Sequence, residues 1–121
     1  MMNKILEIGC GQGFNTYLLS KNKRNKVVGI DLSKENIKVA MKRYPNTEFI
    51  LMNAEEMKFN SNFFNEVYAI DILEHVDNLD KLFREINRVL KRKGVLKINV
   101  PHYNSENWLI KIRPSYFKDI H

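Results

Sequence analysis

The 121-residue chain contains one cysteine, Cys10, and few residues that interrupt regular structure, with five glycines and three prolines. A single cysteine cannot form an internal disulfide, which excludes a disulfide-stabilised secreted scaffold and suits the reducing cytoplasm. No apolar run approaches the roughly twenty residues that a membrane-spanning helix needs. No signal peptide is expected either, because a strand is predicted almost at once, from Lys4. No group of Cys, His and acidic residues has the spacing of metal ligands, so we expect no metal.

The chain is moderately basic. Twenty Lys and Arg residues against fourteen Asp and Glu residues give a net charge of +6. The basic residues gather at Lys21–Lys26 and Lys91–Lys93, where we expect helices to end and cations to complement the helix dipole. No basic stripe is interleaved with aromatic residues, as binding of single-stranded nucleic acid requires. We therefore expect a solvated basic surface and no nucleic acid, with an RNA-facing patch as the alternative.

Apolar runs alternate with helical patterns along the whole chain, which predicts an α/β fold: a three-layer, doubly wound parallel sheet. The expected strands are Lys4–Ile8, Lys26–Ile30, Glu48–Leu51, Glu66–Ile70 and Val95–Val100. The expected helices are Phe14–Lys21, one that follows Ser33 and buries Ile37, Ala40, Met41 and Tyr44, one from Asp77 or Asn78 to Gly94, and Ser105–Ile112. We expect a single domain over residues 1–121, with a core over 3–100 and a C-terminal helical tail over 101–121.

The most informative motif lies at the end of the first apolar run, where residues 6–14 read LEIGCGQGF. Eighteen residues after Gly13, Asp31 closes a second apolar run, VVGID. A strand, a glycine turn, a helix and a strand that ends in a carboxylate are typical of a nucleoside-binding half-domain. A dinucleotide-binding turn requires G-x-G-x-x-G, but the third glycine position holds Phe14 or Thr16. No Gly-Lys-Ser/Thr of a phosphate-binding loop follows either.

The pattern Glu7-x-Gly9-x-Gly11-x-Gly13 resembles that of the class I S-adenosylmethionine (SAM)-dependent methyltransferases. The segment 71–76, DILEHV, is similar to the signature of their type 11 branch, near the ubiquinone and menaquinone biosynthesis methyltransferases. The resemblance covers residues 4–100. It implies a Rossmann-like sheet with strand order 3-2-1-4-5, SAM as the cofactor, and transfer of a methyl group to a small-molecule acceptor.

The resemblance also implies segments before the first strand and after the fifth. Members usually carry helices before the first strand, and a helix with strands 6 and 7 after the fifth, whereas this chain is expected to lack them. The fifth strand is then an uncovered edge, to be covered by the helix around Trp108, by a second copy in a homodimer, or by another partner chain. A truncated, non-catalytic domain that binds cofactor or a partner is the alternative to an enzyme.

The resemblance assigns the cofactor contacts residue by residue. Glu7 complements the positive charges of SAM, and Asp31 accepts hydrogen bonds from both ribose hydroxyls. Asn53 replaces the usual aspartate, and its amide oxygen accepts from the adenine amine, unless Asn53-Ala54 is only the cap of a short helix. Cys10 is expected to place a small side chain against the ligand, with a catalytic thiol as the alternative. The expected set is Glu7, Gly9, Cys10, Gly11, Gly13, Asp31, Leu32, Asn53, Ala54, Asp71 and Ile72.

His75 is the candidate catalytic residue, because it is the only histidine next to the expected site. It could accept a proton from an oxygen or nitrogen nucleophile, or it could only brace the loop. His102 and Tyr103 follow the fifth strand and are weaker candidates for contact with the acceptor. Trp108 is expected to be a packing residue.

Overall fold

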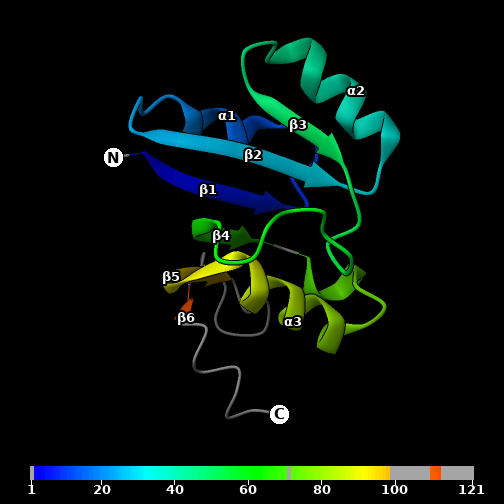
Figure 1. The fold of residues 1–121 in the computed structure, drawn as a ribbon. Helices are drawn as coiled ribbons and strands as arrows, with labels where there is room; N and C mark the ends of the chain where they lie inside the picture. Colours follow the sequence, from blue (N-terminus) through cyan, green and yellow to red (C-terminus); the bar gives the residue numbers. More distant parts are fainter. Residues whose placement is uncertain (1, 71, 99–109, 113–121) are drawn as a thin grey trace.

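The computed structural model describes residues 2–70, 72–98 and 110–112. These residues form one sheet with the strand order β3-β2-β1-β4-β5-β6 (Figure 1). The strands are β1 (Asn3–Ile8), β2 (Asn25–Asp31), β3 (Glu48–Leu51), β4 (Phe64–Ala69), β5 (Leu90–Ile98) and β6 (Ile110–Ile112). The helices are α1 (Phe14–Ser20), α2 (Lys34–Arg43) and α3 (Leu79–Val89), with a short 3-10 helix, η1, at Leu73–His75. The first five strands are parallel, which confirms the predicted fold class and the order 3-2-1-4-5.

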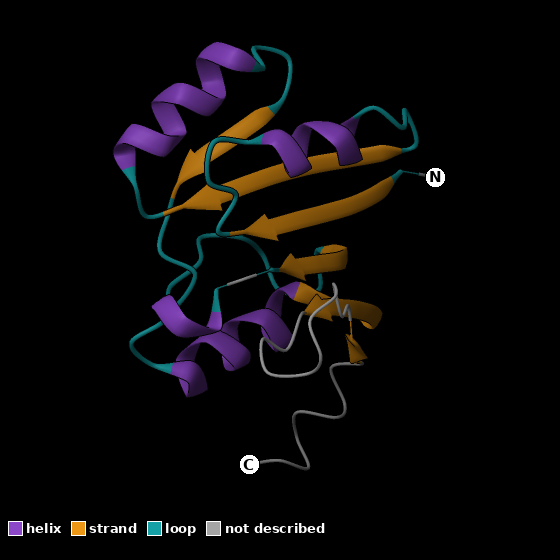
Figure 2. Cartoon of the chain, turned by 180° about the vertical axis from the view of Figure 1, so that it is seen from behind, coloured by secondary structure: helices purple, strands orange, loops and turns teal. Residues whose placement is uncertain are grey.

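Helices cover both faces of the sheet, as Figures 1 and 2 show from opposite sides. Side chains alternate between the two faces along each strand, so Leu6 and Ile8 point to one face and Ile5 points to the other. Leu6 and Ile8 belong to the main core, together with Leu82 and Ile86 of α3. The opposite face packs against α1 and α2 in two smaller apolar clusters. The structure is therefore the expected three-layer arrangement.

Two helices begin where the sequence predicts. The Ser33 hydroxyl accepts a hydrogen bond from the Asn36 backbone N–H at 3.1 Å, and the Asn78 side chain accepts one from the Lys81 N–H at 3.1 Å. Each bond satisfies one of the N–H groups that a helix leaves unpaired in its first turn. The expected buried face of α2 is wrong at Met41, which is 54% exposed. Among the described residues, no helix is both long and apolar enough to cross a membrane.

The predicted end of α3 at Gly94 is wrong. The helix ends at Val89, and β5 begins at once at Leu90, whose side chain is buried where the strand pairs with Phe64 of β4. Lys91–Lys93 therefore lie in a strand and not at a helix end. The apolar spacing of α3 continues through Leu90, so periodicity alone could not separate the last helical residue from the first residue of a buried strand.

The expectations for the C-terminal segment need correction. Ile110–Ile112 form the short strand β6, antiparallel to β5, where we predicted the end of a helix over Ser105–Ile112. The sheet thus has a sixth strand, and β5 is not an uncovered edge over Leu96–Ile98. Most of the expected helical tail, Trp108 included, lies outside the described residues.

Candidate functional site

The glycine turn connects the carboxyl end of β1 to α1. Gly9, Gly11 and Gly13 all have positive φ angles, of 72°, 55° and 94°, which other residues rarely adopt. A Cβ atom at Gly9 would collide with the Ile72 side chain, whereas one at Gly11 would have no heavy atom within 4 Å. The turn therefore brings bare backbone beside an open space at Gly11, which suits the close approach of a ligand.

Asp31, at the end of β2, is held by two backbone N–H groups. Its Oδ2 accepts from the Gly11 N–H at 2.8 Å, and its Oδ1 accepts from the Ser33 N–H at 2.8 Å. The first bond joins the carboxylate to the glycine turn, and the second joins it to the start of α2. Each carboxylate oxygen has a second lone pair, so the group can still accept donors from a ligand in a fixed orientation.

A cavity of about 310 Å³ opens beside Asp31 at the carboxyl ends of the strands. This is the edge of an open parallel sheet where ligands bind. Its walls are largely apolar and come from strand ends and the following loops. The lining residues are Ile8, Gly9, Ile30, Asp31, Leu32, Asn36, Met52, Asn53, Ala54, Glu55, Ile72, His75 and Val76. The structure therefore brings together seven expected site residues: Gly9, Asp31, Leu32, Asn53, Ala54, Ile72 and His75.

The loop after β3 forms one wall of this cavity. The Met52 N–H donates to the Asp31 carbonyl at 3.1 Å, which keeps the loop beside β2. The Asn53 Oδ1 accepts from the Glu55 N–H at 2.9 Å, and the Asn53 carbonyl accepts from the Glu56 N–H at 3.1 Å. Asn53 therefore closes a turn and caps no helix. Its amide oxygen keeps one lone pair, and its NH₂ group is a further donor.

Glu7 points away from the cavity. Its side chain is 4% exposed and faces α1, where it accepts hydrogen bonds from the Thr16 hydroxyl and, at 2.7 Å, from the Asn15 amide. Burial raises the pKa of Glu7, and the hydrogen bonds from Thr16 and Asn15 oppose the rise. Glu7 is not among the residues that line the cavity. Its hydrogen bonds join the end of β1 to α1 and thereby fix the two ends of the glycine turn.

Cys10 also points into the protein. It is 7% exposed and packs with Ile37, Ala40 and Phe49. Burial raises the pKa of the thiol to about 12, and the negative charges of Asp31 and Glu7 add to the rise. A thiol with such a pKa remains protonated at neutral pH, so it is not an activated nucleophile. The side chain of Cys10 is part of the core and is not among the residues that line the cavity.

His75 lies at the mouth of the cavity. Its side chain is exposed, and its backbone N–H donates to the Ile72 carbonyl at 2.9 Å, which closes η1. Gly11 and Gly13 shape the turn but do not line the cavity. The expected sites at Asp71, His102 and Tyr103 lie outside the described residues. Among those described, no three Cys, His, Asp or Glu residues come together as metal ligands.

Six lining residues are absent from the sequence-based set: Ile8, Ile30, Asn36, Met52, Glu55 and Val76. Ile8 and Ile30 occupy the last positions of predicted strands that face the main core, so alternation along β1 and β2 could have identified them. Asn36 carries no such signal, because it lies on α2 and reaches the cavity only through the way that helix packs.

Comparison with known proteins places these features in a family. The family model described as "Methyltransferase domain", of type 11, matches residues 6–98. The chain is 34% identical over 117 residues to a demethylmenaquinone methyltransferase of Chlorobaculum tepidum, and the match covers 97% of this chain and 48% of that protein. The chain thus spans about half the length of this curated relative.

Solved structures show the same fold. The PH0226 protein from Pyrococcus horikoshii superposes with a TM-score of 0.76 at 32% identity, over 81% of this chain and 49% of the other. A phosphoethanolamine N-methyltransferase 2 from Haemonchus contortus, solved in complex with S-adenosyl-L-methionine, superposes with a TM-score of 0.76 at 30% identity. The match covers 81% of this chain and 24% of the other. Together with the matched family model, the glycine turn and the cavity at the strand ends, these likenesses show that the chain belongs to the type 11 methyltransferase domain family.

Proposed function

We propose that this chain is the cofactor-binding domain of a SAM-dependent methyltransferase that acts on a small-molecule acceptor. The observation that carries the proposal is the cavity beside Asp31, bordered by the glycine turn and by the loop after β3. A polar group for ribose hydroxyls and apolar walls for a base are the chemistry that an adenosine moiety requires. The related proteins named above, which include a complex with S-adenosyl-L-methionine, support this choice.

Each wall of the cavity has a part in this proposal. Asp31 accepts from the two ribose hydroxyls, in the orientation that the Gly11 and Ser33 N–H groups impose. Leu32, 66% exposed, covers one face of the adenine, while Asn53 and the Ala54 backbone N–H bind its edge. The open backbone at Gly11 accommodates the amino-acid end of the cofactor. Among the residues that the sequence predicts as cofactor contacts, Gly9 and Ile72 shape the wall of the cavity. Glu7, Cys10 and Gly13 support the glycine turn.

The proposed reaction depends mainly on alignment. When bound, SAM supplies an activated methyl group on a sulfonium that is already a good leaving group. The protein then has to hold an acceptor atom in line with that methyl group and exclude water. His75, exposed at the mouth of the cavity, is the proposed general base for an oxygen or nitrogen acceptor. We also propose that the protein acts in the cytoplasm, because its single cysteine is buried and forms no disulfide.

Calorimetric titration with S-adenosylhomocysteine, the product form of the cofactor, tests the proposal. The full chain is titrated, and its melting temperature is then recorded without ligand and at saturation. At about a hundred times its dissociation constant, the ligand should add about 2.7 kcal/mol to the free energy of unfolding. No heat and no shift of the melting temperature from a folded chain would overturn the cofactor assignment and favour a domain that only binds a partner.

A further inference from the structure

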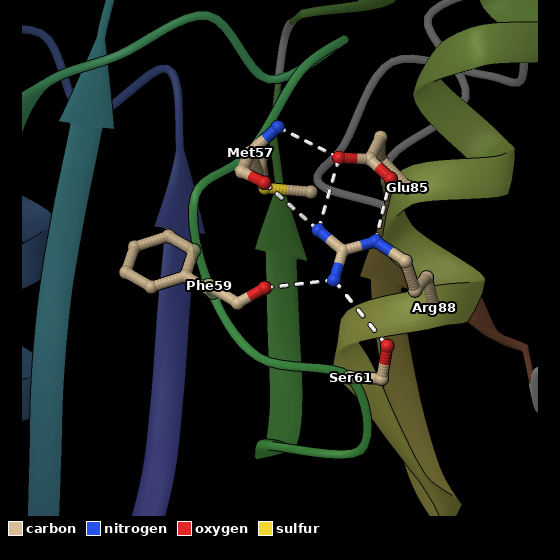
Figure 3. Close-up of polar contacts among 5 residues, drawn as sticks. All are labelled: Met57, Phe59, Ser61, Glu85 and Arg88. Carbon is tan, nitrogen blue, oxygen red and sulfur yellow. Dashed lines mark hydrogen bonds and ion pairs between the residues drawn. The ribbon is translucent and has the colours of Figure 1, made fainter.

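We propose that Glu85 and Arg88 of α3 are positioning residues for the cofactor: they fix the backbone of the loop that forms the adenine side of the cavity. Neither residue lines the cavity, and neither was part of the predicted site. The inference rests on the proposed function, because it assigns to these residues an effect on the same ligand. Figure 3 shows both side chains extending from α3 toward the loop.

The Arg88 guanidinium binds the loop backbone at two points. Its Nη2 donates to the Met57 carbonyl at 2.8 Å, and its Nη1 donates to the Phe59 carbonyl at 2.7 Å (Figure 3). A guanidinium has five donors in one plane, so a single side chain can hold two carbonyls at a fixed separation. These bonds join α3 to residues that are distant in sequence, across the end of the main core.

Glu85 completes the arrangement. Its Oε1 accepts from the Met57 N–H at 2.7 Å, so both backbone groups of Met57 are bound by α3. Its Oε2 accepts from Arg88 Nε at 2.7 Å, an ion pair that fixes the guanidinium. The bonds from Arg88 and from the Met57 N–H lower the pKa of Glu85, although burial opposes them, so the carboxylate stays charged at neutral pH.

The position of Met57 makes this contact relevant to the cavity. The loop is held at its start by the bond from the Met52 N–H to Asp31 and at its end by Glu85 and Arg88. Only residues 53–56 lie between these two anchors, and Asn53, Ala54 and Glu55 among them line the cavity. The Met57 side chain is 6% exposed in the main core, so the second anchor cannot shift without disturbing α3. Loss of the bonds from Glu85 and Arg88 would leave Met57 held by its side chain alone, so the backbone next to the cavity-lining turn would be less firmly placed.

The test compares Arg88→Gln and Glu85→Gln with Arg92→Gln, a control at an exposed arginine of β5. Dissociation constants for S-adenosylhomocysteine are measured by calorimetry at a temperature where melting curves show every variant folded. We expect the first two variants to bind about tenfold more weakly, a change of about 1.4 kcal/mol, and the control to bind like the wild type. Arg88→Lys should fall in between, because its single ammonium cannot hold both carbonyls.

Hydrogen exchange on the ligand-free variants separates positioning from general destabilisation. We expect amides of residues 53–59 to exchange faster in Arg88→Gln, while those of β1 and β2 keep their wild-type rates. A folded Arg88→Gln variant with wild-type affinity and wild-type exchange in this loop would overturn the inference. If the wild type itself fails to bind, the proposed function is wrong, and the exchange rates alone decide whether Glu85 and Arg88 fix the loop.

Discussion

Asp31 is the side chain with the most direct predicted effect on the ligand. Replacing it with alanine removes a charged acceptor from the cavity, and hydrogen bonds to charged groups are worth about 1.5–3 kcal/mol. We expect Asp31→Ala to weaken binding of S-adenosylhomocysteine by roughly 10- to 150-fold in calorimetry. Glu35→Ala, at an exposed acid in the first turn of α2, gives the same charge change outside the cavity lining and should have little effect. Equal affinities of the two variants would show that Asp31 does not contact the ligand.

Glu7 makes a prediction about stability. Its pKa in the folded protein is raised above the ordinary value of 4.5 by burial. Between these two pKa values the folded chain holds a proton that the unfolded chain has released. The free energy of unfolding therefore falls as pH rises through this window, by up to about 1.4 kcal/mol per pH unit.

Replacing Glu7 with glutamine removes this titration. The neutral amide can still accept from Thr16 or Asn15, so the Glu7→Gln variant should show a flatter pH dependence in urea unfolding between pH 4 and pH 8. Glu48→Gln, at an exposed acid at the start of β3, is the control and should keep the wild-type slope. A slope for Glu7→Gln as steep as that of the wild type would assign the pH dependence to other groups.

The sequence predicts on which face of the sheet Glu7 lies, but not its hydrogen-bond partners. Alternation along β1 places Glu7 on the face opposite Leu6 and Ile8. Ile8 lines the cavity, so Glu7 had to point toward the helix on the other face. Its hydrogen bonds to Asn15 and Thr16 depend on how closely α1 approaches the sheet. No spacing in the sequence encodes that distance, although Gly29 permits it: a Cβ there would lie 2.8 Å from the Thr16 hydroxyl oxygen.

At the scale of elements, α3 carries much of the main core. Ile86 is fully buried on this helix, whereas Leu79, two turns earlier, is 44% exposed. We expect Ile86→Ala to lower the free energy of unfolding by about 2–5 kcal/mol, since it leaves a cavity in a packed interior. Leu79→Ala should change it by only about 0.5 kcal/mol. Chemical unfolding of both variants measures the difference, and similar losses would mean that α3 does not pack as described.

Elements could be predicted where pattern and end signals agree. Ser33 and Asn78 fixed the starts of α2 and α3, because a side-chain cap is a local interaction. The end of α3 was missed because Leu90 continues the helical apolar spacing while it pairs with Phe64 of β4. Ile110–Ile112 were expected to be helical, but pairing with β5 makes them a strand. Pairing with a distant strand overrides weak local preference, and a single sequence does not reveal it.

At the scale of the whole molecule, charge is separated along the direction of the strands. The loops and first helical turns at the carboxyl edge of the parallel strands carry more acids than bases: Asp31, Glu35, Glu55, Glu56, Glu74, Asp77 and Asp80 against Lys34, Lys58 and Lys81 among the described residues. The opposite edge carries more bases than acids: Lys21, Lys23, Arg24, Lys42, Arg43, Lys91, Arg92 and Lys93 against Glu48 among the described residues. The residues at the edge where the cavity opens thus carry more negative than positive formal charge, although the chain as a whole has a charge of +6.

This separation predicts a difference between the two forms of the cofactor. SAM carries one net positive charge because of its sulfonium, whereas S-adenosylhomocysteine is neutral overall. Attraction to the acidic edge acts over several ångströms and is screened as ionic strength rises. We therefore expect the affinity for SAM to fall roughly fivefold between low salt and 0.5 M salt, about 1 kcal/mol, while the affinity for S-adenosylhomocysteine changes little.

Two charge-reversal variants test whether the salt dependence of SAM binding comes from the acidic edge or from the net charge of the chain. Glu56→Lys changes the acidic edge outside the cavity lining, and Glu48→Lys makes the same change at the opposite end of the strands. Glu56→Lys should weaken binding of SAM at low salt more than Glu48→Lys does, because Glu56 is next to the cavity-lining residue Glu55, Glu48 lies at the other end of β3, and the Coulomb energy falls with distance. Parallel salt dependence for SAM and S-adenosylhomocysteine, or equal effects of the two variants, would mean that the ligand responds only to contacts inside the cavity. The charge separation would then bear on solubility alone.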